Sequence, residues 1–240
     1  MSENSRRWAP YGVDAAPLPA VVGAAGVACA AAAVASPRHR VGLALAAAGL
    51  LGQTAVYLHT TLRGKLRIWE RELDRLGLNG DERLLDIGCG RGAVLVAAAR
   101  KLPAGRATGI DLWTADQSGN SRDATLANAR AAGVADRVDV RTGDMTGLPF
   151  ADGSFDVVTA AMAIHNVPSS AGRLRAVDEA LRVLRPGGRL LVADPWPMAR
   201  SYAAHLGRGA ARPLGAGYWY GGPWLGVTML EVVKGAGPDA

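Results

Sequence analysis

Two stretches near the start of the chain contain no charged side chain, which restricts what this part can fold into. Residues 17–36 and 41–59 hold no Asp, Glu, Lys or Arg, and only residues 37–40 (Pro-Arg-His-Arg) separate them. Each stretch is close to the roughly 20 residues that a helix needs to cross a bilayer. The pattern predicts a helical hairpin over residues 1–60, which we interpret as a transmembrane anchor.

Two other interpretations of this hairpin stay open. The first stretch is rich in Ala, Gly and Val, which favour membrane insertion less than Leu or Phe. The hairpin can therefore also be a soluble helical lid over an active site. Residues 5–7 (Ser-Arg-Arg) before an apolar run that ends at residues 33–35 (Ala-Val-Ala) also resemble a twin-arginine export signal, although the apolar sequence continues past Pro37.

Basic residues on either side of the hairpin predict its orientation. Those near the two ends are Arg6, Arg7, Arg63, Lys65 and Arg67, whereas the turn contains Arg38 and Arg40. Basic residues favour the cytoplasmic side of a membrane. We therefore expect a membrane-associated protein with two N-terminal spans and a cytoplasmic catalytic domain.

The remainder of the chain, residues 61–240, has a different pattern. Short apolar runs alternate with amphipathic stretches, and Gly- and Asp-rich joins separate them, which is typical of βα units. Apolar residues recur at three- and four-residue steps over residues 66–76, which predicts an amphipathic helix directly after the hairpin.

Composition excludes several classes of site. Cys29 and Cys89 have neither disulfide nor metal-site spacing, and no metal is predicted. The net charge of +6 comes from dispersed basic residues that do not interleave with aromatic ones, so a nucleic-acid partner is not expected.

A glycine-rich turn follows the first apolar strand of this second region. Residues 83–94 read as a strand, a turn with Gly88, Gly90 and Gly92, and the start of a helix, which lets a ligand approach bare backbone. The glycine spacing of this turn also fits the dinucleotide-binding fingerprint, so an NAD(P)-dependent oxidoreductase is one alternative. Asp86 favours another ligand, because a carboxylate there suits the cationic amino group of an amino acid and would repel a pyrophosphate.

Acidic residues also end the next strands. Asp111 closes a strand 23 residues after Gly88, at a position suited to the two ribose hydroxyls of an adenosine. Asp144 follows a third strand over residues 137–142 and can accept a hydrogen bond from an adenine amino group, while Met145 can pack on the ring. Further strands are predicted at residues 154–161, 189–193 and 228–234, with a helix over 176–184 that residues 185–188 (Arg-Pro-Gly-Gly) end.

Four segments in order carry a family resemblance. LLDIGCGRG, GIDLW, TGDMTGLPFADGSFDVV and LRVLRPGGRLLVAD are similar to the successive motifs of class I S-adenosylmethionine (SAM)-dependent methyltransferases, over about residues 80–195. The resemblance implies an α/β, Rossmann-like fold with a seven-stranded sheet, helices on both faces and a final antiparallel strand, with SAM as cofactor. The motifs are most similar to the small-molecule branch that acts on quinones, sterols and related lipids.

The resemblance also implies the cofactor site. The residues expected to contact SAM are Asp86, Gly88, Gly90, Asp111, Leu112, Asp144 and Met145. We add Cys89, Gly92, Trp113 and Gly143 from the same segments, and Ala161 from the end of the fourth predicted strand. His165 follows the fourth strand and is the candidate general base for an acceptor that must lose a proton.

The acceptor is expected to be a small hydrophobic or lipid-like molecule at the membrane surface. Two segments can line its pocket, the polar insertion at residues 113–121 and the YWYGGPW run at residues 218–224, while residues 59–61 can close over SAM. A non-catalytic SAM-binding membrane protein remains the second alternative. The oligomeric state is not predicted.

Overall fold

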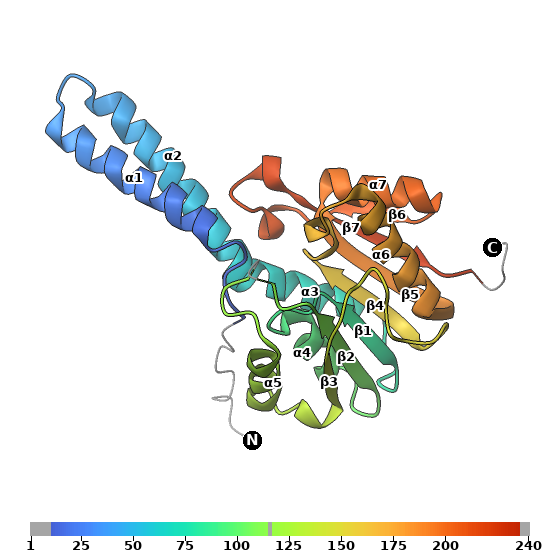
Figure 1. Ribbon diagram of the computed structural model, residues 1–240. Helices are drawn as coiled ribbons and strands as arrows, with labels where there is room; N and C mark the ends of the chain where they lie inside the picture. Colours follow the sequence, from blue (N-terminus) through green and yellow to red (C-terminus); the bar gives the residue numbers. More distant parts are fainter. Residues whose placement is uncertain (1–10, 115–116, 236–240) are drawn as a thin grey trace.

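The structure is a computed structural model that describes residues 11–114 and 117–235, so Arg6 and Arg7 lie outside the described part. The predicted hairpin is present. Helix α1 (Pro17–Ala35) and helix α2 (Arg40–His59) run antiparallel and project away from the rest of the protein (Figure 1). Small residues let the two helices approach closely, since a Cβ on Gly26 would lie 2.9 Å from Cγ of Leu51.

The outer surface of the hairpin is apolar. Val21, Val34, Val41 and Leu45 each expose between 68% and 79% of their surface. By length and composition, both helices are candidates for a membrane span, although a signal sequence or a core helix passes the same test. Because little of either helix is buried within the protein, the hairpin is not a core element of the fold.

Helix α2 continues without a break into the body of the protein. It passes through a π-helical turn, η2 (Thr60–Gly64), into the amphipathic helix α3 (Lys65–Arg75), which confirms the helix predicted there. The whole helix spans 36 residues, Arg40–Arg75. The domain boundary predicted at residue 60 therefore coincides with a π turn inside one helix, and π turns often mark functional sites.

Seven strands form one sheet in the order β3-β2-β1-β4-β5-β7-β6. They are β1 (Arg83–Ile87), β2 (Arg106–Asp111), β3 (Val138–Thr142), β4 (Phe155–Ala161), β5 (Leu184–Pro195), β6 (Ala210–Pro213) and β7 (Val227–Val233). Strands β1 to β5 are parallel, and β7 pairs antiparallel with both β5 and β6. The predicted Rossmann-like sheet with a final antiparallel strand is confirmed.

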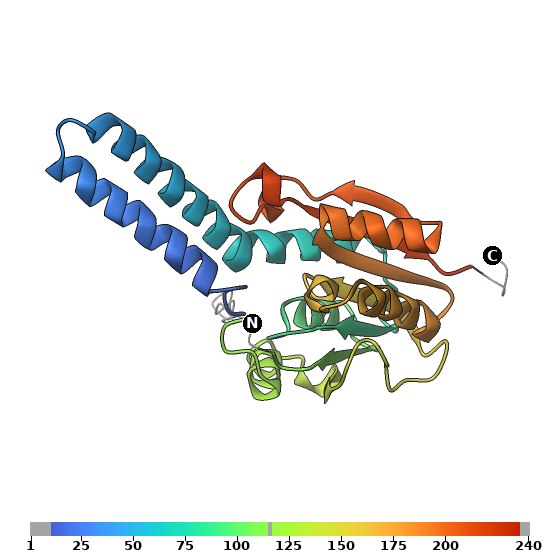
Figure 2. The same cartoon turned by 45° about the horizontal axis from the view of Figure 1, so that its top comes forward.

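Helices cover both faces of the sheet (Figure 2). Helix α3, with α4 (Ala93–Arg100) and α5 (Arg122–Ala131), packs on the face that includes Leu84, whereas α6 (Ser170–Val183) and α7 (Trp196–Leu206) pack on the face that includes Leu85. The alternation of neighbouring residues between the two clusters is the period-2 pattern of a strand buried on both sides. Short helical turns complete the chain at η3 (Ala135–Arg137), η4 (Ile164–Asn166), η5 (Ala216–Tyr218) and η6 (Pro223–Leu225).

Two predicted boundaries were wrong: helix α6 begins at Ser170 rather than at residue 176, and the fifth strand begins earlier than expected. The Arg-Pro-Gly-Gly run at residues 185–188 does not precede the fifth strand but lies within it, since β5 begins at Leu184. Gly187 adopts φ +75°, and its N–H bonds to the carbonyl of Lys234 at 2.8 Å. A register shift opposite Phe155 and Val157 absorbs the extra residues, so a glycine signal that suggested a loop marks an irregularity of the strand.

Candidate functional site

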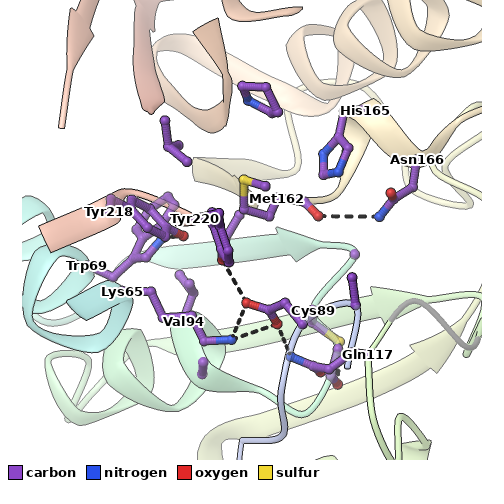
Figure 3. Close-up of a pocket in the computed structure, with 18 of the residues that line it drawn as sticks. Lys65, Trp69, Cys89, Val94, Gln117, Met162, His165, Asn166, Tyr218 and Tyr220 are labelled. Carbon is purple, nitrogen blue, oxygen red and sulfur yellow. Dashed lines mark hydrogen bonds and ion pairs between the residues drawn. The ribbon is translucent and has the colours of Figure 1, made fainter. Parts of the chain in front are cut away.

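A cavity of about 300 Å³ lies at the carboxyl ends of β1, β2 and β4. This is the edge at which open α/β sheets bind ligands. Figure 3 shows that its walls come from elements far apart in the sequence. Among the predicted site residues, those that line it are Asp86, Gly88, Cys89, Gly90, Asp111, Ala161 and His165.

The glycine-rich turn forms the floor of the cavity with bare backbone. Gly88 has φ +67°, and a Cβ there would lie 2.3 Å from Cβ of Ala163, so a side chain at this position is excluded sterically. Gly90 has φ +51° and likewise has no room beside Oε1 of Gln117. The turn then leads into α4, so the backbone and the start of that helix face the cavity.

Asp86 lies at the floor, with 1% of its surface exposed. Burial raises the pKa of Asp86 to about 7, and a hydrogen bond from Oγ1 of Thr159, at 2.8 Å from Oδ1, opposes that shift. The Asp111 carboxylate raises the pKa further. A cation bound in the cavity would stabilise the ionised form of Asp86.

The Asp111 carboxylate is held at the end of β2 by backbone donors. Gly90 N–H donates to Oδ2 at 2.8 Å, and Trp113 N–H donates to Oδ1 at 2.6 Å. Asn120 also contacts Oδ1, at 3.3 Å. The carboxylate is therefore fixed in orientation at the cavity wall, as the recognition of a diol requires.

Cys89 is buried and faces the cavity beside the carboxyl groups of Asp86 and Asp111. Desolvation, together with Asp86 and Asp111, raises the pKa of the Cys89 thiol well above its ordinary value. The thiol is neutral, and it is not a reactive nucleophile.

The other predicted cofactor residues do not line this cavity: Gly92, Leu112, Trp113, Gly143, Asp144 and Met145. Most of them lie next to it. The Gly143 N–H bonds to the carbonyl of Asp111 at 3.1 Å, and Cε of Met145 would lie 3.3 Å from a Cβ on Gly88. Leu112 exposes 53% of its surface, so its side chain forms an open ledge after β2.

His165 lies on the far side of the cavity from β2, in η4 after β4. Its Nδ1 is 2.9 Å from Oδ1 of Asp194, a residue with no exposed surface. The second carboxylate oxygen of Asp194 accepts hydrogen bonds from the His165 backbone N–H at 3.0 Å and from the Tyr202 hydroxyl at 3.1 Å. A buried carboxylate on Nδ1 fixes the orientation and the tautomer of the imidazole.

The sequence did not predict a group of polar residues around Asp14. Lys65 Nζ lies 2.8 Å from each carboxylate oxygen of Asp14, while Tyr220 and Gln117 bond to it at 2.7 and 2.9 Å (Figure 3). Burial opposes ionisation of Asp14, but Lys65 and the hydrogen bonds outweigh it, so the pKa of Asp14 is lowered. The group ties the residues before the hairpin to the helix after it.

The segments expected to line the acceptor pocket or to close over SAM contribute to the cavity wall only in part. Gln117 and Asn120 from the polar insertion line the cavity, as do Tyr218 and Tyr220 from the YWYGGPW run. Residues 59–61 do not line it: His59 is exposed, while Thr60 and Thr61 are buried beside it. Residues 115–116 lie outside the described part of the insertion.

Strained backbone also gathers here. Within the described residues, the non-glycine positions with positive φ are Ala15, Trp113 and Met162. Ala15 and Met162 line the cavity, and Trp113 follows Asp111. Strain of this kind concentrates at functional sites, where the surrounding structure holds it in place.

Comparison with known proteins identifies the domain that contains this cavity. Residues 85–192 match the profile of a family described as a methyltransferase domain, and this match covers the glycine-rich turn, Asp111 and His165. The chain carries a class I SAM-dependent methyltransferase domain. The predictions of this fold and of SAM as the cofactor are thereby confirmed, and the oxidoreductase alternative finds no support.

Two curated relatives illustrate the family. The methyltransferase domain is 40% identical over 130 residues to a ubiquinone/menaquinone biosynthesis C-methyltransferase of Roseobacter denitrificans, which covers 53% of this chain and 48% of the relative. It is also 40% identical over 130 residues to the 27-O-demethylrifamycin SV methyltransferase of Amycolatopsis mediterranei, covering 53% and 44%. The chain thus spans about half the length of the curated relatives it matches.

A solved structure agrees on the fold. The 4+2 cyclase SpnF superposes with a TM-score of 0.55 at 25% identity, covering 70% of this chain and 82% of SpnF. The family's fold thus also occurs in a protein described as a cyclase, so the reaction of this chain has to be argued from its own site.

Proposed function

We propose that the protein transfers a methyl group from SAM to a small hydrophobic or lipid-like acceptor that reaches the site from a membrane surface. The observation that carries the proposal is that one cavity joins the cofactor turn to the foot of the apolar hairpin. Asp86 at the end of β1 and Gly88 in the turn line it on one side, and Leu18 of α1 and Tyr57 of α2 line it from the hairpin.

The cofactor half of the cavity suits SAM. Asp86 would face the positively charged methionine end, and the fixed Asp111 carboxylate would accept the ribose hydroxyls. The ledge formed by Leu112, Asp144 and Met145 would hold the adenine beyond the cavity itself, which accounts for their position next to it. SAM supplies an activated methyl group, and these residues bind and orient it.

The acceptor half is largely apolar, which favours a hydrophobic substrate. Its walls include Leu18, Trp69, Tyr218, Leu225 and Val227. Burial of apolar surface contributes about 25 cal/mol per Å² to the binding of such a molecule. By their names, one relative acts in ubiquinone/menaquinone biosynthesis and the other on 27-O-demethylrifamycin SV, and an organic acceptor of this kind is compatible with an apolar wall.

His165 would act as general base where the acceptor is a hydroxyl or an acidic carbon. Asp194 holds Nδ1, which favours the neutral tautomer that carries its proton on Nδ1 and its lone pair on Nε2, and His165 lines the cavity. The proton of the acceptor would pass to Nε2 as the oxygen or carbon attacks the methyl group, and the sulfonium leaves as a neutral thioether.

The membrane part of the proposal rests on the exposed apolar surface of the hairpin. A soluble lid would cover the site, whereas only Leu18 and Tyr57 of the two helices line the cavity and the rest of the hairpin projects away (Figure 1). Removal of the hairpin as an export signal after residue 35 would also remove Asp14, Ala15 and Leu18 from the cavity wall. Both features favour an anchor that is retained.

The acceptor class is tested by supplying two extracts of the source cells, one lipid and one aqueous, to the purified full-length protein with methyl-labelled SAM. We expect a labelled product, identified by mass spectrometry, from the lipid extract. A product from the aqueous extract alone would contradict a lipid-like acceptor. Bound SAM without product from either extract would favour the non-catalytic alternative.

A further inference from the structure

The segment between β6 and β7, residues 214–226, is an exposed aromatic loop. It reads LGAGYWYGGPWLG, and no charged residue occurs anywhere in residues 213–230. Trp224 exposes 65% of its surface and Leu225 exposes 44%, although both are large and apolar. Exposed apolar residues in an uncharged segment mark an interaction surface.

This aromatic loop packs against the end of the hairpin that joins the body of the protein. Thr60 Oγ1 donates to the carbonyl of Trp219 at 2.6 Å. A Cβ on Gly221 would lie 2.8 Å from Cγ of Gln53, so the loop backbone touches α2 there as well. Figures 1 and 2 both show the loop beside the end of α2 that joins the body. The loop therefore contacts this continuous helix at Gln53 of α2 and at Thr60 of η2.

The length of the helix from Arg40 to Arg63 indicates how deep the aromatic loop would lie in a membrane. No charged residue lies between Arg40 at the tip of the hairpin and Arg63 after its base. At 1.5 Å per residue this interval is about 35 Å long, close to the roughly 30 Å hydrocarbon core of a bilayer. Gln53 is nearer to the tip than Arg63 by about 15 Å on the same measure.

A hairpin inserted less deeply would leave the arginines at its tip inside the membrane. With Gln53 at the membrane surface, Arg40 and its neighbour Arg38 would be only about 20 Å deep, inside the hydrocarbon, where charged side chains are strongly disfavoured. With Arg40 and Arg63 at opposite headgroup layers, the part of the loop at Gln53 is below the surface. The two arginines can both be hydrated only when the aromatic loop enters the membrane.

The backbone of the loop is suited to that environment. Tyr220 N–H bonds to the carbonyl of Leu225, Gly221 N–H to that of Trp219, and Leu225 N–H to that of Gly222. Backbone groups satisfied within a segment lower the cost of leaving water. Tryptophan also favours the interface between headgroups and acyl chains.

We propose that the aromatic loop is a third membrane-inserted element, with Trp224 and Leu225 among the acyl chains beside the hairpin. The inference rests on the proposed role of the hairpin as an anchor. Its partner is the lipid bilayer itself. Because Tyr218, Tyr220 and Leu225 also line the cavity, the cavity opens toward the lipid, and the acceptor enters from the bilayer rather than from water.

The test uses the full-length protein in phosphatidylcholine vesicles whose acyl chains carry bromine, which quenches tryptophan on contact. The contribution of Trp224 is the difference between the wild type and Trp224→Phe. Trp113→Phe is the matched control, because Trp113 lies after β2 and donates to Thr142 away from the hairpin. We expect bromine to quench the Trp224 contribution and to leave that of Trp113 unchanged.

Vesicle retention after a carbonate wash separates the possible failures. An unquenched Trp224 in protein that stays with the vesicles would overturn the inserted loop and leave the anchor standing. Protein that the wash releases from the vesicles would overturn the loop and the anchor together.

Discussion

At the scale of single residues, the cofactor site depends on carboxylates at strand ends. Asp111→Ala would remove a fixed acceptor from the ribose hydroxyls, and we expect SAM affinity to fall by about 1.5 to 3 kcal/mol. Isothermal titration calorimetry measures this loss. Asp139→Ala is the control, because Asp139 on β3 pairs with Arg141 outside the cavity, and its affinity should match the wild type. Equal affinities for all three proteins would refute the ribose role.

The pKa of Asp86 gives SAM binding a pH dependence. Burial raises this pKa to about 7, so the cavity without ligand holds a proton below that pH. A bound cation favours the carboxylate, and binding must then release the proton. SAM affinity should therefore rise by up to about tenfold per pH unit as pH increases toward 7, and level off above it. Asp86→Asn should abolish this slope, and a slope that persists in the variant would assign it to another group.

His165, which Asp194 orients, is proposed to act on the acceptor, so its loss should lower turnover rather than cofactor binding. We expect His165→Ala to lower kcat by roughly 100-fold to 10,000-fold with nearly unchanged SAM affinity. The matched control is His205→Ala, since His205 also bonds a carboxylate, that of Asp178 at 2.8 Å, but outside the cavity. Asp194→Asn should lower kcat and shift its pH profile. Wild-type turnover in His165→Ala would restrict His165 to a structural role.

Some of these residues can be predicted from sequence, and others cannot. Asp86, Asp111 and His165 each follow an apolar strand, and parallel strands bring their ends to one edge. Asp14 gives no such signal, because its partners Lys65 and Tyr220 lie 51 and 206 positions away in the sequence. An isolated Asp before an apolar run also resembles an ordinary helix-flanking residue, so only the tertiary structure reveals its place in the wall.

At the scale of elements, the ion pair of Asp14 and Lys65 fastens the foot of the hairpin to the body. Lys65→Met would leave Asp14, whose side chain is only 19% exposed, without its cation, and we expect a loss of about 3 to 5 kcal/mol in unfolding free energy. Denaturant unfolding in detergent measures it. The control is Lys101→Met, whose partner Asp74 is 66% exposed, and which should change stability by less than about 1 kcal/mol. Equal effects would show that the pair near the cavity is not structural.

Element prediction succeeded where the hydrophobic pattern was unambiguous. The hairpin, the helix after it and the first four strands lie where apolar periodicity placed them. The start of β5 was misplaced because Arg-Pro-Gly-Gly is usually a turn, whereas pairing with β7 holds Gly187 inside the sheet. The continuity of α2 with α3 was also missed, since the change from apolar to amphipathic sequence at Thr60 conceals a helix that does not break.

At the scale of the whole molecule, the proposed orientation places the turn of the hairpin outside and the catalytic domain in the cytoplasm. The structure weakens the charge argument, because Lys65, counted among the basic residues at the base, is buried against Asp14. Arg63 and Arg67 remain exposed there, against Arg38 and Arg40 at the tip. In protein whose Cys29 is replaced by Ser, a cysteine at His39 should react with an impermeant thiol reagent in intact cells. Reaction only after lysis would reverse the orientation.

The central claim is methyl transfer from SAM to a lipid-soluble acceptor. Its most direct measurement follows full-length protein in membranes of its source with methyl-labelled SAM, and compares label in the organic extract with S-adenosylhomocysteine formed. We predict equal amounts of the two, and at limiting SAM a parallel fall in both for Asp111→Ala retained in the same membranes. S-adenosylhomocysteine formed with its label in water-soluble product, or SAM bound and left intact, would contradict the account.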